Sequence, residues 1–161
     1  MNLSIVNKEQ TATTNPECAA KRAKNISRYA VKNVLELCVG NSFLSLKEEY
    51  RRHGLICWGN DVDIRWKQTE NWLHGNCLDL DYSNFDVVVF APPLSRGCTG
   101  KREDALSVLE VTPTYYEFLQ KIKYYRNKIF VLTLPAKTFS TSSDRNQYQR
   151  LLAYIYKLVQ P

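Results

Sequence analysis

The stretch "NVLELCVGNSFLSLKEEYRRHG", residues 33–54, places an unbroken apolar run directly before an amphipathic one. Residues 33–39 are hydrophobic apart from the opening Asn33 and one acid, as in a strand that is buried on both faces. Residues 42–54 carry three apolar side chains on one helical face, namely Phe43, Leu46 and Tyr50. The stretch therefore predicts a strand, a turn and a helix in succession.

The same alternation continues in both directions along the chain. Further apolar strands are expected at 55–61, 72–76, 85–91 and 128–135. Helices are expected at 16–29, 112–125 and 144–159, with a short helical or irregular crossing at 64–72. Apolar strands separated by helices indicate a mostly parallel sheet that is covered on both faces. We therefore expect a doubly wound α/β fold with about five strands, in a single domain over residues 1–161.

The composition is that of an ordinary globular chain. Of its 161 residues, 44% are hydrophobic and 24% are charged. Residues 1–15 lack periodicity and are rich in Thr, Asn and Gln, which predicts a flexible N-terminal arm. No apolar run approaches the roughly 20 residues of a membrane span, and the N-terminus lacks the layout of a secretory signal. We therefore expect a cytoplasmic protein with no membrane partner.

Basic residues give the chain a net charge of +6 and gather at 21–28, 47–53 and 121–128. The last of these clusters, "KIKYYRNK", has two tyrosines among its cations. Clustered Lys and Arg with aromatic rings suit a polyanion such as nucleic acid. Solvated helix faces would give the same pattern, so charge alone leaves both interpretations open.

The five cysteines are odd in number and widely spaced, at positions 18, 38, 57, 77 and 98. Zinc sites and redox motifs need closely spaced thiols, and no such pair occurs here. We therefore expect no metal site and interpret the cysteines as small, buried hydrophobic residues.

The ends of the predicted strands are where ligands bind in such sheets. Gly40 follows the first strand, where it lets the backbone approach a ligand beside the N–H groups of the next helix. Asp61 ends the second strand, at a separation from Gly40 that suits a carboxylate binding ribose hydroxyls. Asn76 ends the third strand, where its side-chain amide could hydrogen-bond to the edge of a purine. The fourth strand ends in residues 91–94, "APPL", a corner that either only terminates the strand or braces a substrate.

This ordered series resembles the class I S-adenosylmethionine-dependent methyltransferases over about residues 17–135. "VLELCVGNSF" is similar to the family's first motif, Asp61 in "GNDVD" to the acid that holds the cofactor ribose, and Asn76 in "HGNCLDL" to the position that contacts the adenine amino group. "FDVVVFAPPLS" resembles the fourth motif of enzymes that methylate amino groups of nucleic-acid bases or glutamine. The resemblance implies a Rossmann-like core that binds S-adenosyl-L-methionine through Glu36, Leu37, Gly40, Asn41, Ser42, Asp61, Val62, Asn76 and Cys77.

The chain also departs from the family pattern. Cys38 and Ser42 stand where further glycines are common, but both are small enough for close approach. Ala91 replaces the Asn or Asp that accepts a hydrogen bond from the target amine, and Leu94 replaces the aromatic residue that stacks on the base. The closing antiparallel hairpin of the family has no counterpart among the expected strands. We expect Ala91, Pro92, Pro93 and Leu94 to form the catalytic corner.

The segment 95–112, "SRGCTGKREDALSVLEVT", is a long polar connection beside this corner. Connections of this length in compact domains are often functional, so the segment is a candidate lid or substrate-reading loop. Its expected substrate contacts are Ser95, Arg96, Lys101 and Arg102, the last three to phosphate. Cys98 could be considered a nucleophile, but its loop position favours a bystander.

Two functions from different classes follow. The first is an active methyltransferase that acts on nucleic acid, either RNA or DNA. The second is a methyltransferase-like module without catalysis that binds nucleic acid or a partner subunit, and a homo-oligomer is also open. A dinucleotide-dependent dehydrogenase is disfavoured, because the Pro-Pro corner has no role in that chemistry.

Overall fold

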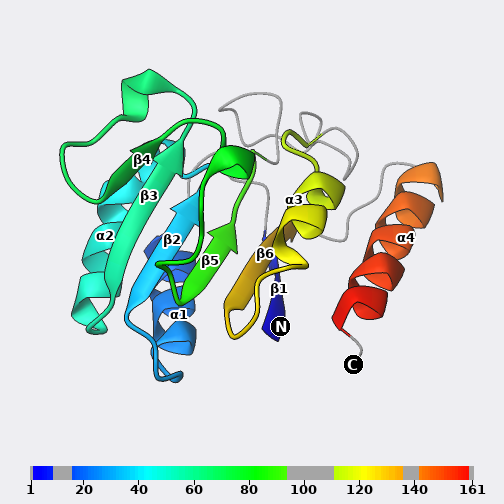
Figure 1. Cartoon of the computed structure of the whole chain (residues 1–161), viewed down its shortest axis with the longest axis horizontal. Helices are drawn as coiled ribbons and strands as arrows, with labels where there is room; N and C mark the ends of the chain where they lie inside the picture. The colour runs from blue at the N-terminus through cyan, green and yellow to red at the C-terminus, as the bar shows by residue number, and fades with distance from the viewer. Residues whose placement is uncertain (1, 9–15, 94–110, 136–141, 160–161) are drawn as a thin grey trace.

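A single six-stranded sheet, all of whose paired strands are parallel, forms the centre of the computed structural model, which describes residues 2–8, 16–93, 111–135 and 142–159 (Figure 1). The strand order is β1-β6-β5-β2-β3-β4. The strands are β1 Asn2–Lys8, β2 Asn33–Leu37, β3 Ile56–Asp61, β4 Trp72–His74, β5 Val87–Phe90 and β6 Ile129–Pro135. The parallel sheet that the apolar runs predict is confirmed.

Helices cover both faces of this sheet (Figure 1). They are α1 Pro16–Ile26, α2 Phe43–Arg52, α3 Tyr115–Ile122 and α4 Ser142–Val159, with short 3-10 turns at Gly40–Ser42, Ile64–Trp66 and Cys77–Asp79. Helices α1 and α2 lie on one face, and α3 and α4 lie on the other. The fold is therefore α/β of the doubly wound, Rossmann-like type. In the part of the chain that is described, no helix has both the length and the apolar character to span a bilayer.

The N-terminal segment differs from the expected flexible arm. Residues 2–8 form strand β1, which pairs in parallel with β6 from Asn2 opposite Ile129 to Lys8 opposite Pro135. The expected strands are present as β2 to β6, and the N-terminus supplies a sixth, in parallel. Local sequence could not show this, because the partner strand lies more than a hundred residues along the chain.

The face under α1 and α2 is packed from small residues on α1 and large ones on α2. Ala19 and Ala23 are fully buried, and the predicted helical stripe of Phe43, Leu46 and Tyr50 is buried as expected. Gly59 lies in β3 beneath this layer. A Cβ atom there would come within 2.5 Å of the Phe43 ring and 2.9 Å of the Trp72 ring, so only glycine fits without movement.

The face under α3 and α4 is packed mainly by aromatic rings. The Phe90 and Phe118 rings stack with centroids 4.3 Å apart and planes only 5° from parallel. Tyr115 packs edge-on against Phe90, and its hydroxyl donates to the backbone oxygen of Thr133 at 2.7 Å. The helix α3 that carries these rings begins at a capping box of Thr114 and Glu117. The helix begins at Tyr115, three residues after Thr112, where the expected helical segment 112–125 begins.

Candidate functional site at the strand tips

The carboxyl ends of four neighbouring strands lie along one edge of the sheet, at the upper side of Figure 1. The registers place Leu37 beside Asn60 on one side and Phe90 on the other, and Asp61 beside His74. The tips of β5, β2, β3 and β4 are therefore adjacent and level. The chain runs outward from β2 to β3 and β4 and then returns to β5, so the strand order reverses between β2 and β5. Ligands of doubly wound sheets bind at this switch point.

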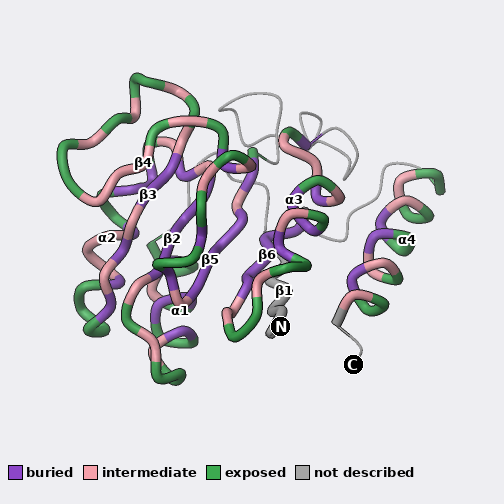
Figure 2. Tube along the Cα trace, in the orientation of Figure 1, coloured by how far each residue is buried: buried purple, intermediate pink, exposed green. Residues whose placement is uncertain are grey.

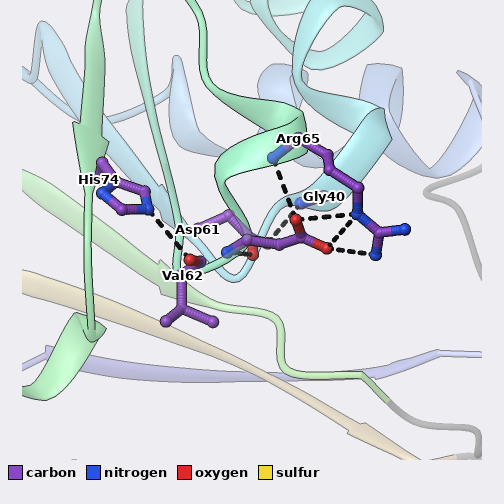
Figure 3. A network of polar contacts seen from close by, with 6 residues as sticks. Gly40, Asp61, Val62, Arg65 and His74 are labelled. Atoms are coloured by element: carbon purple, nitrogen blue, oxygen red, sulfur yellow. Dashed lines mark hydrogen bonds and ion pairs between the residues drawn. The ribbon is translucent and has the colours of Figure 1, made fainter.

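Asp61 at the tip of β3 is joined directly to the glycine turn after β2. One carboxylate oxygen accepts from the Gly40 N–H at 2.9 Å, and the other accepts from the Asp63 N–H at the same distance (Figure 3). A carboxylate offers about four acceptor positions, so each oxygen keeps one for a further donor. Gly40 and Asp61, singled out separately from the sequence, are thus in contact.

The turn between β2 and α2 is built from two residues with left-handed backbone. Gly40 has φ +53°, and Cys38 has φ +57°. Glycine adopts this conformation freely, whereas in a residue with a Cβ it costs about 1–2 kcal/mol. Cys38 therefore keeps the backbone shape of a glycine at a cost in free energy. A Cβ on Gly40 would meet nothing within 4 Å, so open space lies beside the turn.

The segment after β3 is held against the tip of β4. The His74 ring nitrogen Nε2 lies 3.0 Å from the Val62 backbone oxygen (Figure 3). Asp63 caps the following 3-10 turn by accepting from the Arg65 N–H at 3.0 Å, and its carboxylate also binds the Arg65 guanidinium. The Val62 side chain is left 69% exposed. An exposed apolar side chain beside Asp61 could pack against the flat face of a base.

Two asparagines organise the tip of β4. Asn60 is buried, and its Nδ2 donates to the backbone oxygens of Leu73 and Gly75 at 2.9 Å each. This residue was not among those predicted from the sequence, where its signal would have been a polar side chain in an apolar strand. Asn76 is exposed, and its Oδ1 accepts from the Leu78 N–H at 3.0 Å. The Asn76 amide nitrogen has no partner among the described residues and is available to a ligand.

Glu36, expected from the resemblance to bind the cofactor, is buried beside two polar side chains. Its side chain is 0% exposed, and its carboxylate binds the Arg22 guanidinium at 2.8 Å and the Tyr50 hydroxyl. Burial alone would lower the pKa of Arg22, but the adjacent Glu36 charge raises it overall. Burial followed by the Glu36 charge raises the pKa of Tyr50, which keeps its proton as a donor. Glu36 therefore belongs to the interior under α1 and α2, where its carboxylate is already paired.

The other residues of the implied cofactor set divide between core and surface. Leu37 is fully buried under the α3 face, Ser42 is buried, and Asn41 is exposed. Cys77 is buried with its sulfur 3.9 Å from that of Cys38. The Cys38 S–H donates in this contact, which raises the pKa of Cys38 and lowers that of Cys77.

The Pro-Pro corner follows β5 directly. Ala91 is half-buried against the α1 and α2 core, Pro92 is buried, and Pro93 is exposed. The Phe90 backbone oxygen is held by the Thr133 hydroxyl at 3.0 Å, which fixes the start of the corner. The remaining expected catalytic and substrate residues lie outside the described residues; they are Leu94, Ser95, Arg96, Lys101 and Arg102.

Comparisons with protein-family models and with curated proteins find no match to this chain. Whether an adenosyl cofactor fits therefore depends on the groups at the strand tips. They offer an acid with free acceptor positions at Asp61, an exposed amide at Asn76, and open space beside Gly40 and Gly75. These groups fit the ribose hydroxyls, the base edge and the close backbone approach that such a molecule needs. Within the described residues, no cluster of three or more His, Cys, Asp or Glu could hold a metal.

Proposed function

We propose that this protein is an S-adenosyl-L-methionine-dependent methyltransferase that acts on nucleic acid. The observation that carries the proposal is the contact between the Gly40 N–H and the Asp61 carboxylate, at the reversal of strand order. It brings together two of the groups that the sequence resemblance assigns to one cofactor. The Pro-Pro corner stands at the tip of the next strand, β5.

In this function the residues at each strand tip bind a different part of the cofactor or the substrate. Asp61 accepts hydrogen bonds from the ribose hydroxyls. The turn at Gly40 lets the cofactor come close to the backbone, and Asn76 hydrogen-bonds to the edge of the adenine. The cofactor supplies an electrophilic methyl group, and the protein contributes by positioning the acceptor in line with it. The backbone oxygens of Ala91 and Pro92 are the acceptors that the corner offers to the substrate. Because Ala91 has no polar side chain, a strong nucleophile such as a ring nitrogen is favoured over an exocyclic amine.

Calorimetry with S-adenosyl-L-methionine tests the cofactor site. Asp61→Ala is expected to weaken binding by at least about tenfold, because the two ribose hydroxyls lose their acceptor. Asp63→Ala is the matched control, since it removes an acid two residues away that is already paired with Arg65. Equal affinity of wild type and Asp61→Ala, or no binding by wild type, would contradict the proposal.

Transfer of a labelled methyl group to RNA, DNA and protein fractions then tests turnover and substrate class together. Label in a nucleic-acid fraction that depends on Asp61 is the expected result. Label in protein alone would overturn the nucleic-acid part of the proposal.

A second candidate is a methyltransferase-like module that binds nucleic acid or a partner subunit without catalysis. The half-buried methyl group of Ala91 favours it, because the side chain at this tip offers no acceptor to a target amine. Cofactor binding with no transfer to any fraction would favour this function over the first.

A further inference from the structure

The basic clusters of the sequence lie at the edge of the sheet opposite the strand tips. Each one ends shortly before a strand begins: 21–28 before β2, 47–53 before β3, and 121–128 before β6. Because the paired strands are parallel, these segments share the amino-end edge, at the lower side of Figure 1. The candidate cofactor site and the clustered positive charge are therefore on opposite edges of the molecule.

Two of these segments are close neighbours in space. The registers place Val34 of β2 and Ile129 of β6 on either side of Val87. Adjacent strands are about 4.8 Å apart, so the connections that enter β2 and β6 are roughly 10 Å apart. Backbone hydrogen bonds from Asp86 N–H to the Asn33 oxygen and from Ile129 N–H to the Asp86 oxygen tie the two connections together.

Exposed cations follow these two connections, whose exposed residues are green in Figure 2. We call them the basic strip: Arg28, Lys32, Lys123 and Arg126. None of the four forms an ion pair within the described residues.

Two acids that contact these connections in space are already engaged. One oxygen of Asp86 accepts from the backbone N–H groups of Lys32 and Asn33, both at 2.8 Å. The carboxylate of Asp81 accepts from Ser83 and from the Tyr125 hydroxyl. These carboxylates reduce the positive potential of the strip but form no ion pair with its cations.

The third basic segment of this edge has a different charge balance. Arg51 and Arg52, at the end of α2, are paired with Glu48 and Glu49 at 2.8–3.4 Å. Their charge is largely compensated within one helix. This segment therefore fits the alternative that its charges only solvate a helix face. The basic strip, in contrast, retains a net positive charge.

Two exposed tyrosines stand among the cations of the strip. Tyr124 is 77% exposed, and Tyr29 is 55% exposed. The Lys123 ammonium lies 4.8 Å from the centroid of the Tyr124 ring. Exposed rings beside cations without an ion pair are the combination that single-stranded nucleic acid uses, with phosphates on the cations and bases on the rings.

We propose that the basic strip binds the backbone of a single-stranded nucleic acid, with Tyr29 and Tyr124 stacking on its bases. The choice of nucleic acid as the partner rests on the proposed function. The strip adds to that function a binding surface that is separate from the candidate cofactor site. Strand β2 has five residues, so about 17 Å of sheet separates the strip from the strand tips. A bound strand would be anchored at one edge while a distant nucleotide reaches the other.

Fluorescence anisotropy of the full chain with labelled single-stranded RNA and DNA of about 20 nucleotides tests this interface. Lys32→Ala with Arg126→Ala is expected to weaken binding at least about tenfold at moderate salt. The slope of log affinity against log salt should flatten by about 0.7 for each phosphate that the variant no longer neutralises. Tyr124→Ala should weaken binding by about fivefold or more, because each stacked base contributes about 1–3 kcal/mol.

Arg51→Ala with Arg52→Ala is the matched control, because it removes the same charge from the same edge at ion-paired positions. Affinity within about twofold of wild type is expected for this control. Equal losses in both double variants would show a nonspecific effect of net charge and overturn the inference. Wild-type affinity in the strip variant would overturn it as well.

Two further measurements separate this inference from the proposed function. The strip variant should bind S-adenosyl-L-methionine with the affinity of wild type, because the strip is far from the cofactor site. If wild type itself does not bind the cofactor, the proposed function is contradicted, but the inference about the strip is not. Vesicles that contain phosphatidylserine provide the alternative polyanion. Binding to vesicles that depends on Lys32 and Arg126, without binding to either oligonucleotide, would overturn the nucleic-acid assignment.

Discussion

The two faces of the sheet are stabilised by different kinds of interaction. Under α1 and α2, a carboxylate and a guanidinium are buried together, and Tyr50 donates a hydrogen bond to the carboxylate. Under α3 and α4, stacked and edge-on aromatic rings fill the core. Among the described residues, the buried charged side chains are Arg22 and Glu36, both on the first face. Charge in the middle of an apolar strand can therefore serve the interior as well as a ligand site.

The largest effect is expected from breaking the buried ion pair. Arg22→Met leaves Glu36 buried without a cation and should lower the free energy of unfolding by about 3–5 kcal/mol. Urea denaturation monitored by circular dichroism measures the loss. Lys24→Met is the control, an exposed residue of the same helix that should change stability by less than about 0.5 kcal/mol.

The double variant Arg22→Met with Glu36→Gln sharpens this test. It removes both charges but keeps an acceptor for the Tyr50 hydroxyl, so most of the lost stability should return. If the double variant is as unstable as the single one, the cost comes from altered packing, and the charge difference between the two faces is unimportant.

A smaller loss is expected on the aromatic face. Phe118→Leu keeps most of the apolar volume but removes the ring that stacks on Phe90, and should cost roughly 1–2 kcal/mol. Tyr156→Leu, a 62% exposed position on α4, is the control. A loss as large as that of Arg22→Met would mean that the two faces depend equally on specific contacts.

The sequence predicted the positions of the strands far better than the roles of individual side chains within them. Unbroken apolar runs placed β2, β3, β5 and β6 within two residues of their ends, because burial on both faces leaves a clear local signal. Glu36 could not be assigned in this way. A lone acid in a strand looks the same whether its partner is a ligand or an arginine on a preceding helix. The pairing with Arg22 depends on tertiary packing that no local pattern encodes.

The candidate site shows the same division. The order of Gly40, Asp61, Asn76 and the Pro-Pro corner along the chain, together with a parallel sheet, was enough to predict their adjacency. The direct hydrogen bond from Gly40 to Asp61 and the left-handed Cys38 were not predictable, because they arise from the exact path of a turn. Likewise, strand β1 depends on a distant partner and has no signature of its own.

The Asp86 carboxylate, which lies outside the core, should make the stability of the protein depend on pH. Hydrogen bonds from the Asn33 and Lys32 N–H groups hold the pKa of Asp86 below its usual value, with burial opposing. Because the folded pKa is depressed, this stabilisation is present above the unfolded pKa near about 4 and is lost as pH falls through the folded pKa. Asp86→Asn should cost about 1 kcal/mol at pH 7, since the carboxylate is partly solvated.

Urea denaturation of Asp86→Asn and wild type at several pH values tests this effect. The difference in stability between the two proteins should shrink as the pH is lowered below about 4. Asp81→Asn is a control with an exposed carboxylate that binds side chains and a local turn only. A difference that stays constant with pH would mean that the Asp86 charge does not stabilise the strand bases.

The smallest effect is expected at Cys38, at the tip of β2, where the thiol contacts the aromatic face through Cys77. Cys38→Gly relieves the left-handed strain of about 1–2 kcal/mol, but it adds unfolded-chain entropy and removes the sulfur contact. A net stabilisation of about 0.5 kcal/mol should remain, whereas Cys38→Ala, which keeps the Cβ, should stabilise nothing. If both variants lose stability equally, the contact of the thiol contributes more than the backbone strain costs. This end of the aromatic face would then depend on a polar contact, as the opposite face does.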